Sequence, residues 1–138
     1  MDSFLGPWKI TNWDKGSEVP DGIPGNGFKE QGPLNITQPD PNVNSIDLHW
    51  ENDNGEDCSV SGLEFDQGQN QLITPTSTLT VRFPGKDVPC HLTVSSGPGQ
   101  AEITLNIAAI NTMRGSAQDG VMVLPDVGGG TVTAIANG

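Results

Sequence analysis

The chain has no tyrosine, and only six lysines and arginines stand against 17 aspartates and glutamates, which gives a formal net charge of −11 at pH 7. Proteins that bind nucleic acids neutralise phosphates with clustered cations, and anionic membrane surfaces attract basic segments in the same way. The shortage of cations therefore excludes nucleic acid and membrane surfaces as partners. No apolar run approaches the ~20 residues that span a bilayer, and the opening residues lack the pattern of a signal peptide.

Sequence motifs of common enzyme classes are also missing. There is no nucleophile elbow, phosphate-binding loop or dinucleotide fingerprint in the chain. We therefore expect no cofactor, and whether the protein is an enzyme stays open. The polar residues are drawn from Asn, Thr, Ser and Gln more than from Lys and Glu, which favours a secreted or cell-envelope protein over a cytoplasmic one.

What the chain does contain is alternation of apolar and polar residues with a period of two. Ile46, Leu48 and Trp50 alternate with polar residues, as in a half-buried strand. Strands of this kind are expected around Trp8 and at 46–51, 57–65, 78–83, 88–95, 101–109, 121–124 and 131–136, with a bulge near Gly62, and residues 34–37 are the place for at most one further short strand. The 138 residues therefore predict a single all-β domain, an antiparallel β-barrel or β-sandwich of seven to eight short strands.

Residues 14–44 break this pattern with five prolines and five glycines, which weaken strands. We interpret the segment as a long irregular loop that contains one short strand at most. Long loops in compact domains are often functional, and this one carries apolar anchors such as Ile23 and Phe28. We expect both to be pinned to the core, so that the segment borders a ligand site as a lid. The alternative is a structural cover.

Several side chains are candidates for a site. Asp47 and His49 lie two apart on one strand and share its polar face, where they could do acid–base work or form an ordinary solvated pair. The acidic turn at 53–57 lacks a matched set of calcium ligands, and two histidines without a third ligand do not make a zinc site. We therefore predict no metal site.

The tryptophans and cysteines complete the set of candidates. By strand parity, Trp8 and Trp50 belong to the core, whereas Trp13 either covers the end of the core or offers its ring to a sugar. Cys58 and Cys90 fall in predicted strands, so we expect them on neighbouring strands, either as a disulfide or as two buried thiols. The candidate ligand-binding residues are Trp13, Phe28, Trp8, Asp47 and His49.

One short segment carries a family resemblance. Phe4-Leu5-Gly6-Pro7-Trp8-Lys9-Ile10 resembles the Gly-x-Trp first strand of calycins, the lipocalin and fatty-acid-binding barrels. The resemblance implies a barrel that binds a small apolar molecule inside and in which Trp8 closes one end. It covers about seven residues, and the late aromatic and arginine positions of fatty-acid-binding proteins are missing.

Two functional hypotheses follow. The first is a non-catalytic ligand-binding β module with a carbohydrate or a protein as its ligand. The second is a calycin-like barrel that holds a small apolar molecule, either as a carrier or as an enzyme, such as a cyclase, that acts by confining its substrate. Assembly through edge strands, as in a structural subunit, is a third possibility. The sequence leaves the identity of the ligand and the oligomeric state open.

Overall fold

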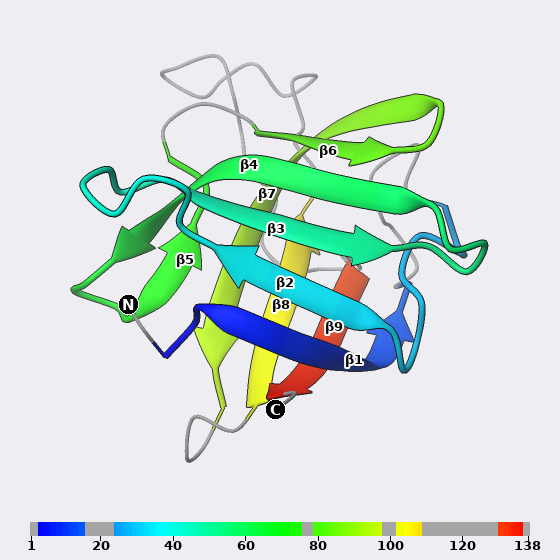
Figure 1. Ribbon diagram of the computed structural model, residues 1–138, viewed down its shortest axis with the longest axis horizontal. Helices are drawn as coiled ribbons and strands as arrows, with labels where there is room; N and C mark the ends of the chain where they lie inside the picture. Colours follow the sequence, from blue (N-terminus) through cyan, green and yellow to red (C-terminus); the bar gives the residue numbers. More distant parts are fainter. Residues whose placement is uncertain (1–2, 16–23, 76–78, 98–101, 109–129, 137–138) are drawn as a thin grey trace.

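The computed structural model describes residues 3–15, 24–75, 79–97, 102–108 and 130–136, and within these ranges all regular structure is β-strand (Figure 1). The nine strands are β1 (Gly6–Asp14), β2 (Pro33–Thr37), β3 (Ile46–Glu51), β4 (Asp57–Asp66), β5 (Gln71–Ile73), β6 (Leu79–Phe83), β7 (Lys86–Ser96), β8 (Glu102–Ala108) and β9 (Gly130–Ala136). The predicted all-β class is confirmed.

The strands close into an antiparallel barrel. Each of the strands β1 to β4 pairs with the next along the chain, β7 to β9 do the same, and β9 pairs back onto β1. In Figure 1, β1–β4 run across the front of the barrel and β7–β9 cross behind them. The wall has eight positions, and the ninth strand arises because β5 and β6 both lie between β4 and β7.

The shared position is divided along the length of β7. The first half of β7 pairs with β6, from Lys86 opposite Phe83 to Cys90 opposite Leu79. The second half pairs with β5, from Thr93 opposite Ile73 to Ser95 opposite Gln71. Two short strands thus fill the place that one long strand would take in a regular barrel.

The barrel interior is packed with apolar side chains. Alternation puts Ile46, Leu48 and Trp50 inside, where they are 0–3% exposed, while His49 faces outward. The core apolar residues on the described strands are at most 5% exposed. An eight-stranded barrel is just wide enough for its own side chains to fill, and a ligand-sized cavity would expose the side chains lining it. The described residues therefore form a filled core.

Local predictions are confirmed at several points. The short strand expected inside 14–44 is β2, and the expected bulge lies in β4, where Ile46 pairs with Leu63 but Leu48 pairs with Val60. Gly62 sits in that bulge with a φ of 95°. Strand β5 was not predicted. The expected strand at 121–124 and the hairpin leading from it to β9 lie outside the described residues.

The expectation that Cys58 and Cys90 lie on neighbouring strands is wrong. Cys58 is on β4 and Cys90 on β7, and β6 runs between them, with Arg82 paired to Ser59 on one side and to Asp87 on the other. Both cysteines are free and buried. Strand parity predicts that the Cys90 thiol faces the core, but parity says nothing about the order of strands in a sheet.

Candidate functional site

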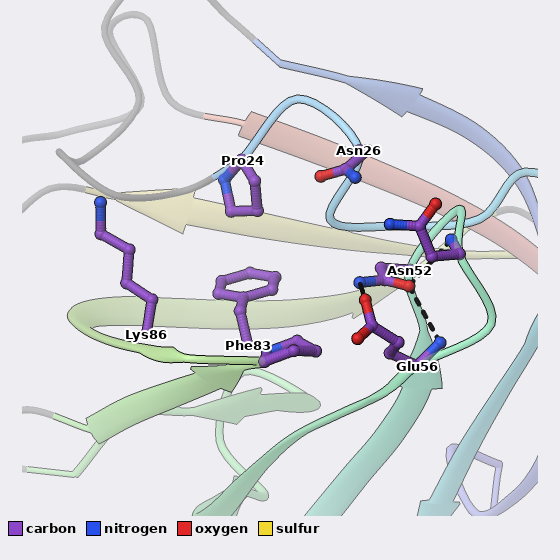
Figure 2. Close-up of a pocket in the computed structure, with 8 residues that line it drawn as sticks. Pro24, Asn26, Asn52, Glu56, Phe83 and Lys86 are labelled. Carbon is purple, nitrogen blue, oxygen red and sulfur yellow. Dashed lines mark hydrogen bonds between the residues drawn. The ribbon is translucent and has the colours of Figure 1, made fainter.

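An open hollow lies at one end of the barrel, where three turns meet (Figure 2). It has a volume of about 400 Å³, within the range typical of small-molecule sites. The turn between β3 and β4, the turn between β6 and β7 and the segment 24–29 contribute its walls. The lining residues are Pro24, Asn26, Asn52, Asn54, Glu56, Phe83, Pro84 and Lys86.

One buried asparagine builds the turn between β3 and β4. Asn52 is 5% exposed, and its side-chain oxygen accepts hydrogen bonds from the backbone N–H groups of Asn54 and Glu56, both at 2.9 Å. Its side-chain nitrogen donates to the Glu56 carboxylate at 3.0 Å, and its backbone carbonyl accepts from Gly55 N–H. Asparagine supports turns in this way. Asn52 thus fixes the position of Asn54 and Glu56 at the rim of the hollow.

The segment 24–29 is tied down by backbone hydrogen bonds to the neighbouring strand ends. Lys29 N–H donates to the carbonyl of Glu51 at 2.9 Å, and Asp53 N–H donates to the carbonyl of Asn26 at 3.0 Å. These bonds join the segment to the end of β3 and to the first residues of the turn between β3 and β4. Two walls of the hollow therefore form one connected unit.

Two indole groups hold the same segment from below. Trp50 Nε1 donates to the carbonyl of Gly27 at 2.8 Å, and Trp13 Nε1 donates to the carbonyl of Gly25 at 2.9 Å. Buried indole N–H groups need such partners. In this barrel the carbonyl groups of the segment 24–29 supply them, which fixes the wall of the hollow to the core.

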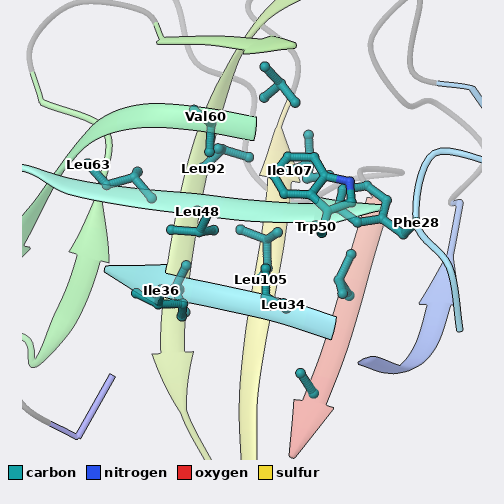
Figure 3. Packing of buried hydrophobic residues seen from close by; sticks show 14 of the residues in the cluster. Phe28, Leu34, Ile36, Leu48, Trp50, Val60, Leu63, Leu92, Leu105 and Ile107 are labelled. Carbon is teal, nitrogen blue, oxygen red and sulfur yellow. The ribbon is translucent and has the colours of Figure 1, made fainter. Parts of the chain in front are cut away.

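Beneath the hollow lies an aromatic cluster made of Trp13, Phe28, Trp50 and Phe83. Phe28 stacks on Trp50 with ring centroids 4.8 Å apart and an interplanar angle of 12°, and Figure 3 shows the two rings side by side. Trp13 lies 4.6 Å from Phe28, and Phe83 meets Phe28 and Trp50 edge-on at 6.1 and 6.0 Å. Phe83 belongs to both the cluster and the hollow, so the floor of the hollow is apolar and rigid.

The rim combines neutral amides with one charge of each sign. Asn26 and Asn54 are exposed, Glu56 supplies a carboxylate and Lys86 an ammonium group, while Pro24 and Pro84 add apolar surface. In a chain of net charge −11 this hollow is close to neutral. Amides and charged groups around an apolar floor can bind hydroxyl groups and the C–H face of an uncharged polar ligand.

The residues proposed from the sequence fall in three places. Phe28 is 1% exposed and lies under the hollow, and Trp13 is half-buried behind its wall. Trp8 is buried in the core, and its Nε1 donates to the carbonyl of Phe4 at 2.8 Å. The expected anchor Ile23 lies outside the described residues.

Asp47 and His49 share the outer face of β3, as their parity predicted. His49 lines a second, smaller hollow of about 100 Å³ together with Asn35, Glu51 and Asp57. The structure does not bring either residue to the larger hollow. The rim residues Asn26, Asn54, Glu56 and Lys86 were not proposed as ligand contacts. Their only sequence signal is that each lies in a turn, next to Asn-Gly or Pro-Gly.

The surroundings of both cysteines favour the protonated thiol over the thiolate. Burial raises the pKa of Cys58 to about 11, helped by the negative charges of Asp57 and Glu56, and burial raises the pKa of Cys90 to about 12. The thiolate is the reactive form of cysteine. Neither cysteine therefore has the character of a nucleophile at neutral pH. Burial also lowers the pKa of His91, which favours the neutral imidazole.

Among the residues that the structure describes, no cluster of three or more His, Cys, Asp or Glu side chains is arranged to hold a metal ion. The same residues contain no helix long and apolar enough to cross a membrane. Comparisons with protein-family models, with curated proteins and with solved structures found no match to this chain.

Proposed function

We propose that the protein is a non-catalytic binding module for an uncharged carbohydrate, and that the hollow between the three turns is its binding site. The observation that carries the proposal is the composition of the hollow. Exposed amides, the Glu56 carboxylate and the Lys86 ammonium group surround a floor formed by Phe83 and two prolines. Sugars present hydroxyl groups at their edges and C–H groups on their faces, and such a lining serves both.

Rigidity also supports a binding role. Two of the walls are fixed by hydrogen bonds: the segment 24–29 is bonded to Trp13, to Trp50, to the end of β3 and to the turn that follows it. A site that is already formed before binding loses little conformational entropy when the ligand arrives. A shallow, open site with weak polar contacts can then still reach a useful affinity.

The test is binding to a glycan array that carries neutral, sialylated and uronic-acid glycans, followed by titration calorimetry with the best neutral oligosaccharide. We expect binding to neutral glycans. Lys86→Ala should weaken it about tenfold, because a hydrogen bond to a charged group contributes about 1.5–3 kcal/mol. Asn35→Ala, on the outer face, is the matched control and should leave affinity unchanged. Binding restricted to anionic glycans, or to none, would overturn the proposal.

The calycin-like alternative has one observation in its favour. Strands that follow one another around a closed antiparallel barrel are typical of the lipocalin type of up-and-down barrel. The packed core of the described residues weighs against an internal apolar ligand. Mass spectrometry of the purified protein tests this alternative, since an apolar carrier should retain a small molecule that is released on denaturation.

A further inference from the structure

Two residues of the rim, Asn26 and Asn54, are each followed by glycine. An Asn-Gly pair can deamidate because glycine offers no Cβ to hinder its own backbone nitrogen. That nitrogen attacks Cγ of the asparagine side chain and loses its proton, and the side-chain nitrogen leaves as ammonia. Water then opens the resulting succinimide at either carbonyl and gives aspartate or isoaspartate. The net reaction converts an amide and water into a carboxylic acid and ammonia.

The pair Asn26–Gly27 is held by the core. Gly27 is buried, its N–H donates to the carbonyl of Pro24 at 3.0 Å, and its own carbonyl accepts the bond from Trp50 Nε1. A Cβ placed on Gly27 would lie 2.8 Å from Cε1 of Phe83. Ring closure has to turn the backbone at Gly27, and these neighbours oppose that rotation.

The pair Asn54–Gly55 is restrained by the turn between β3 and β4 rather than by the core. Both residues are exposed, and a Cβ on Gly55 would meet nothing within 4 Å. The bonds that restrain the pair all come from Asn52, whose carbonyl accepts from Gly55 N–H and whose side-chain oxygen accepts from Asn54 N–H, each at 2.9 Å. Exposed turns of this kind open locally at a small fraction of the cost of global unfolding.

We propose that Asn54 is a deamidation site, that it reacts faster than Asn26 in the folded protein, and that the hydrogen bonds of Asn52 set its rate. Opening the turn frees Gly55 nitrogen for attack without disturbing the aromatic cluster. Asn26 can react only when the wall formed by the segment 24–29 has left Trp50 and Phe83.

The product changes the charge of the hollow. A carboxylate at position 54 joins that of Glu56, so Lys86 no longer balances the negative charge of the rim. If the hollow binds an uncharged sugar, a consequence that rests on the function proposed above, the loss of an amide donor and the added charge weaken that binding. Deamidation would then switch the site off irreversibly as the protein ages.

The chemistry is tested without any ligand. The folded protein is incubated in mildly alkaline buffer, and peptide mapping by mass spectrometry follows aspartate and isoaspartate at positions 26 and 54. We expect conversion at Asn54 to be several-fold faster than at Asn26, and the two rates to become similar in urea. Equal rates in the folded protein, or the same ratio in urea, would overturn the proposal.

Two variants test the role of Asn52. Asn52→Ala removes the side-chain oxygen that accepts from Asn54 N–H and keeps the backbone carbonyl that accepts from Gly55 N–H. The rate at Asn54 should rise several-fold, while the rate at Asn26, whose glycine is held by Trp50 and Phe83, should change much less and thereby report whether the barrel is still folded. If both rates rise together, the second variant, Asn52→Gly, is incubated under the same conditions without urea. Hydrogen exchange of the core amides then shows whether the barrel of each variant is still folded. An unchanged rate at Asn54 in a folded variant contradicts the proposal. Sugar binding by Asn54→Asp and Asn54→Gln separately tests the consequence for the hollow.

Discussion

At the scale of single residues, Phe28 is the side chain on which the proposed site depends most. It is 1% exposed and touches three other aromatic rings, yet it belongs to an irregular segment rather than to a strand. Its neighbour Gly27 accepts the indole bond from Trp50. The ring therefore joins the wall of the hollow to the barrel interior, and loss of the ring should loosen both.

Phe28→Ala should lower the free energy of unfolding by about 3–5 kcal/mol, because it deletes a buried ring and leaves a cavity beside Trp50. Phe28→Leu, which keeps most of the volume, should cost clearly less. Urea unfolding followed by tryptophan fluorescence measures both. The sequence pattern predicts that Phe28→Ala weakens ligand binding more than it lowers global stability, whereas burial of the ring favours a large loss of stability. A loss below about 1 kcal/mol in Phe28→Ala would show that the segment does not depend on this contact.

At the scale of elements, the bulge in β4 sets the register of the barrel wall. Gly62 has a backbone φ of 95°, a value that residues with a side chain rarely adopt. The bulge shifts the register of β4 against β3 at a point between Ile46 and Leu48. Period-2 alternation changes phase at this point, so that Val60 and Leu63 both face inward, where each is at most 1% exposed. A glycine at this position lets one strand bury apolar residues on both sides of the shift.

Gly62→Ala should therefore destabilise the protein by about 1–3 kcal/mol, the cost of holding a non-glycine residue in an unfavourable backbone conformation. The neighbouring Ser61 is exposed, so Ser61→Ala is a matched control that should change stability by less than about 0.5 kcal/mol. Thermal unfolding of both variants gives the comparison. Equal effects would mean that the bulge can be relieved without glycine.

Strands with clear alternation could be predicted, and the exceptions have physical reasons. β5 has only one buried residue, Leu72, in its three residues, which is too short for alternation to be seen. The order of the strands in the sheet could not be predicted from the sequence, because pairing partners are set by the closed barrel and not by parity. For that reason Cys58 and Cys90 were correctly placed in strands but wrongly placed next to each other.

The candidate site was harder to predict than the strands. Its walls come from three turns that are distant in sequence, around Asn26, Asn54 and Lys86. Each turn was recognisable from its glycine or proline, but nothing in the sequence says that the three turns meet. Trp13 and Phe28 were recognised as unusual aromatic residues near a site. They support the hollow from below, whereas the exposed amides and charges of its rim resembled any solvated loop.

At the scale of the whole molecule, closure of the barrel governs stability. The pairing of β9 with β1 joins two strands at opposite ends of the described chain. It also removes the exposed edges that promote association of sheets. Assembly through edge strands therefore finds no support among the described strands, and the packed interior becomes the main source of stability. The two thiols buried in that interior, together with the partly buried His91 on the wall, then contribute to the dependence of stability on pH.

Stability should be greatest between about pH 7 and pH 9, because the two buried thiols and the partly buried His91 titrate outside this window. Burial lowers the pKa of His91 below its usual 6.5, so the unfolded chain takes up a proton first, and stability is lost as the pH falls below 6.5. Burial raises the pKa of Cys58 to about 11 and that of Cys90 to about 12. The unfolded thiols ionise from about pH 9 upward while the native ones stay protonated, so stability is lost as the pH rises towards those values.

Each such thiol lowers the free energy of unfolding by up to about 1.4 kcal/mol per pH unit in this range. Urea unfolding from pH 5 to pH 11 measures the profile, and the absence of tyrosine removes one other group that would titrate at alkaline pH. Cys90→Ala lacks one thiol, so its stability, although lower throughout, should fall less steeply above pH 9 than that of the unmodified chain. The same alkaline slope in both proteins would mean that Cys90 is not protected from ionisation in the folded barrel.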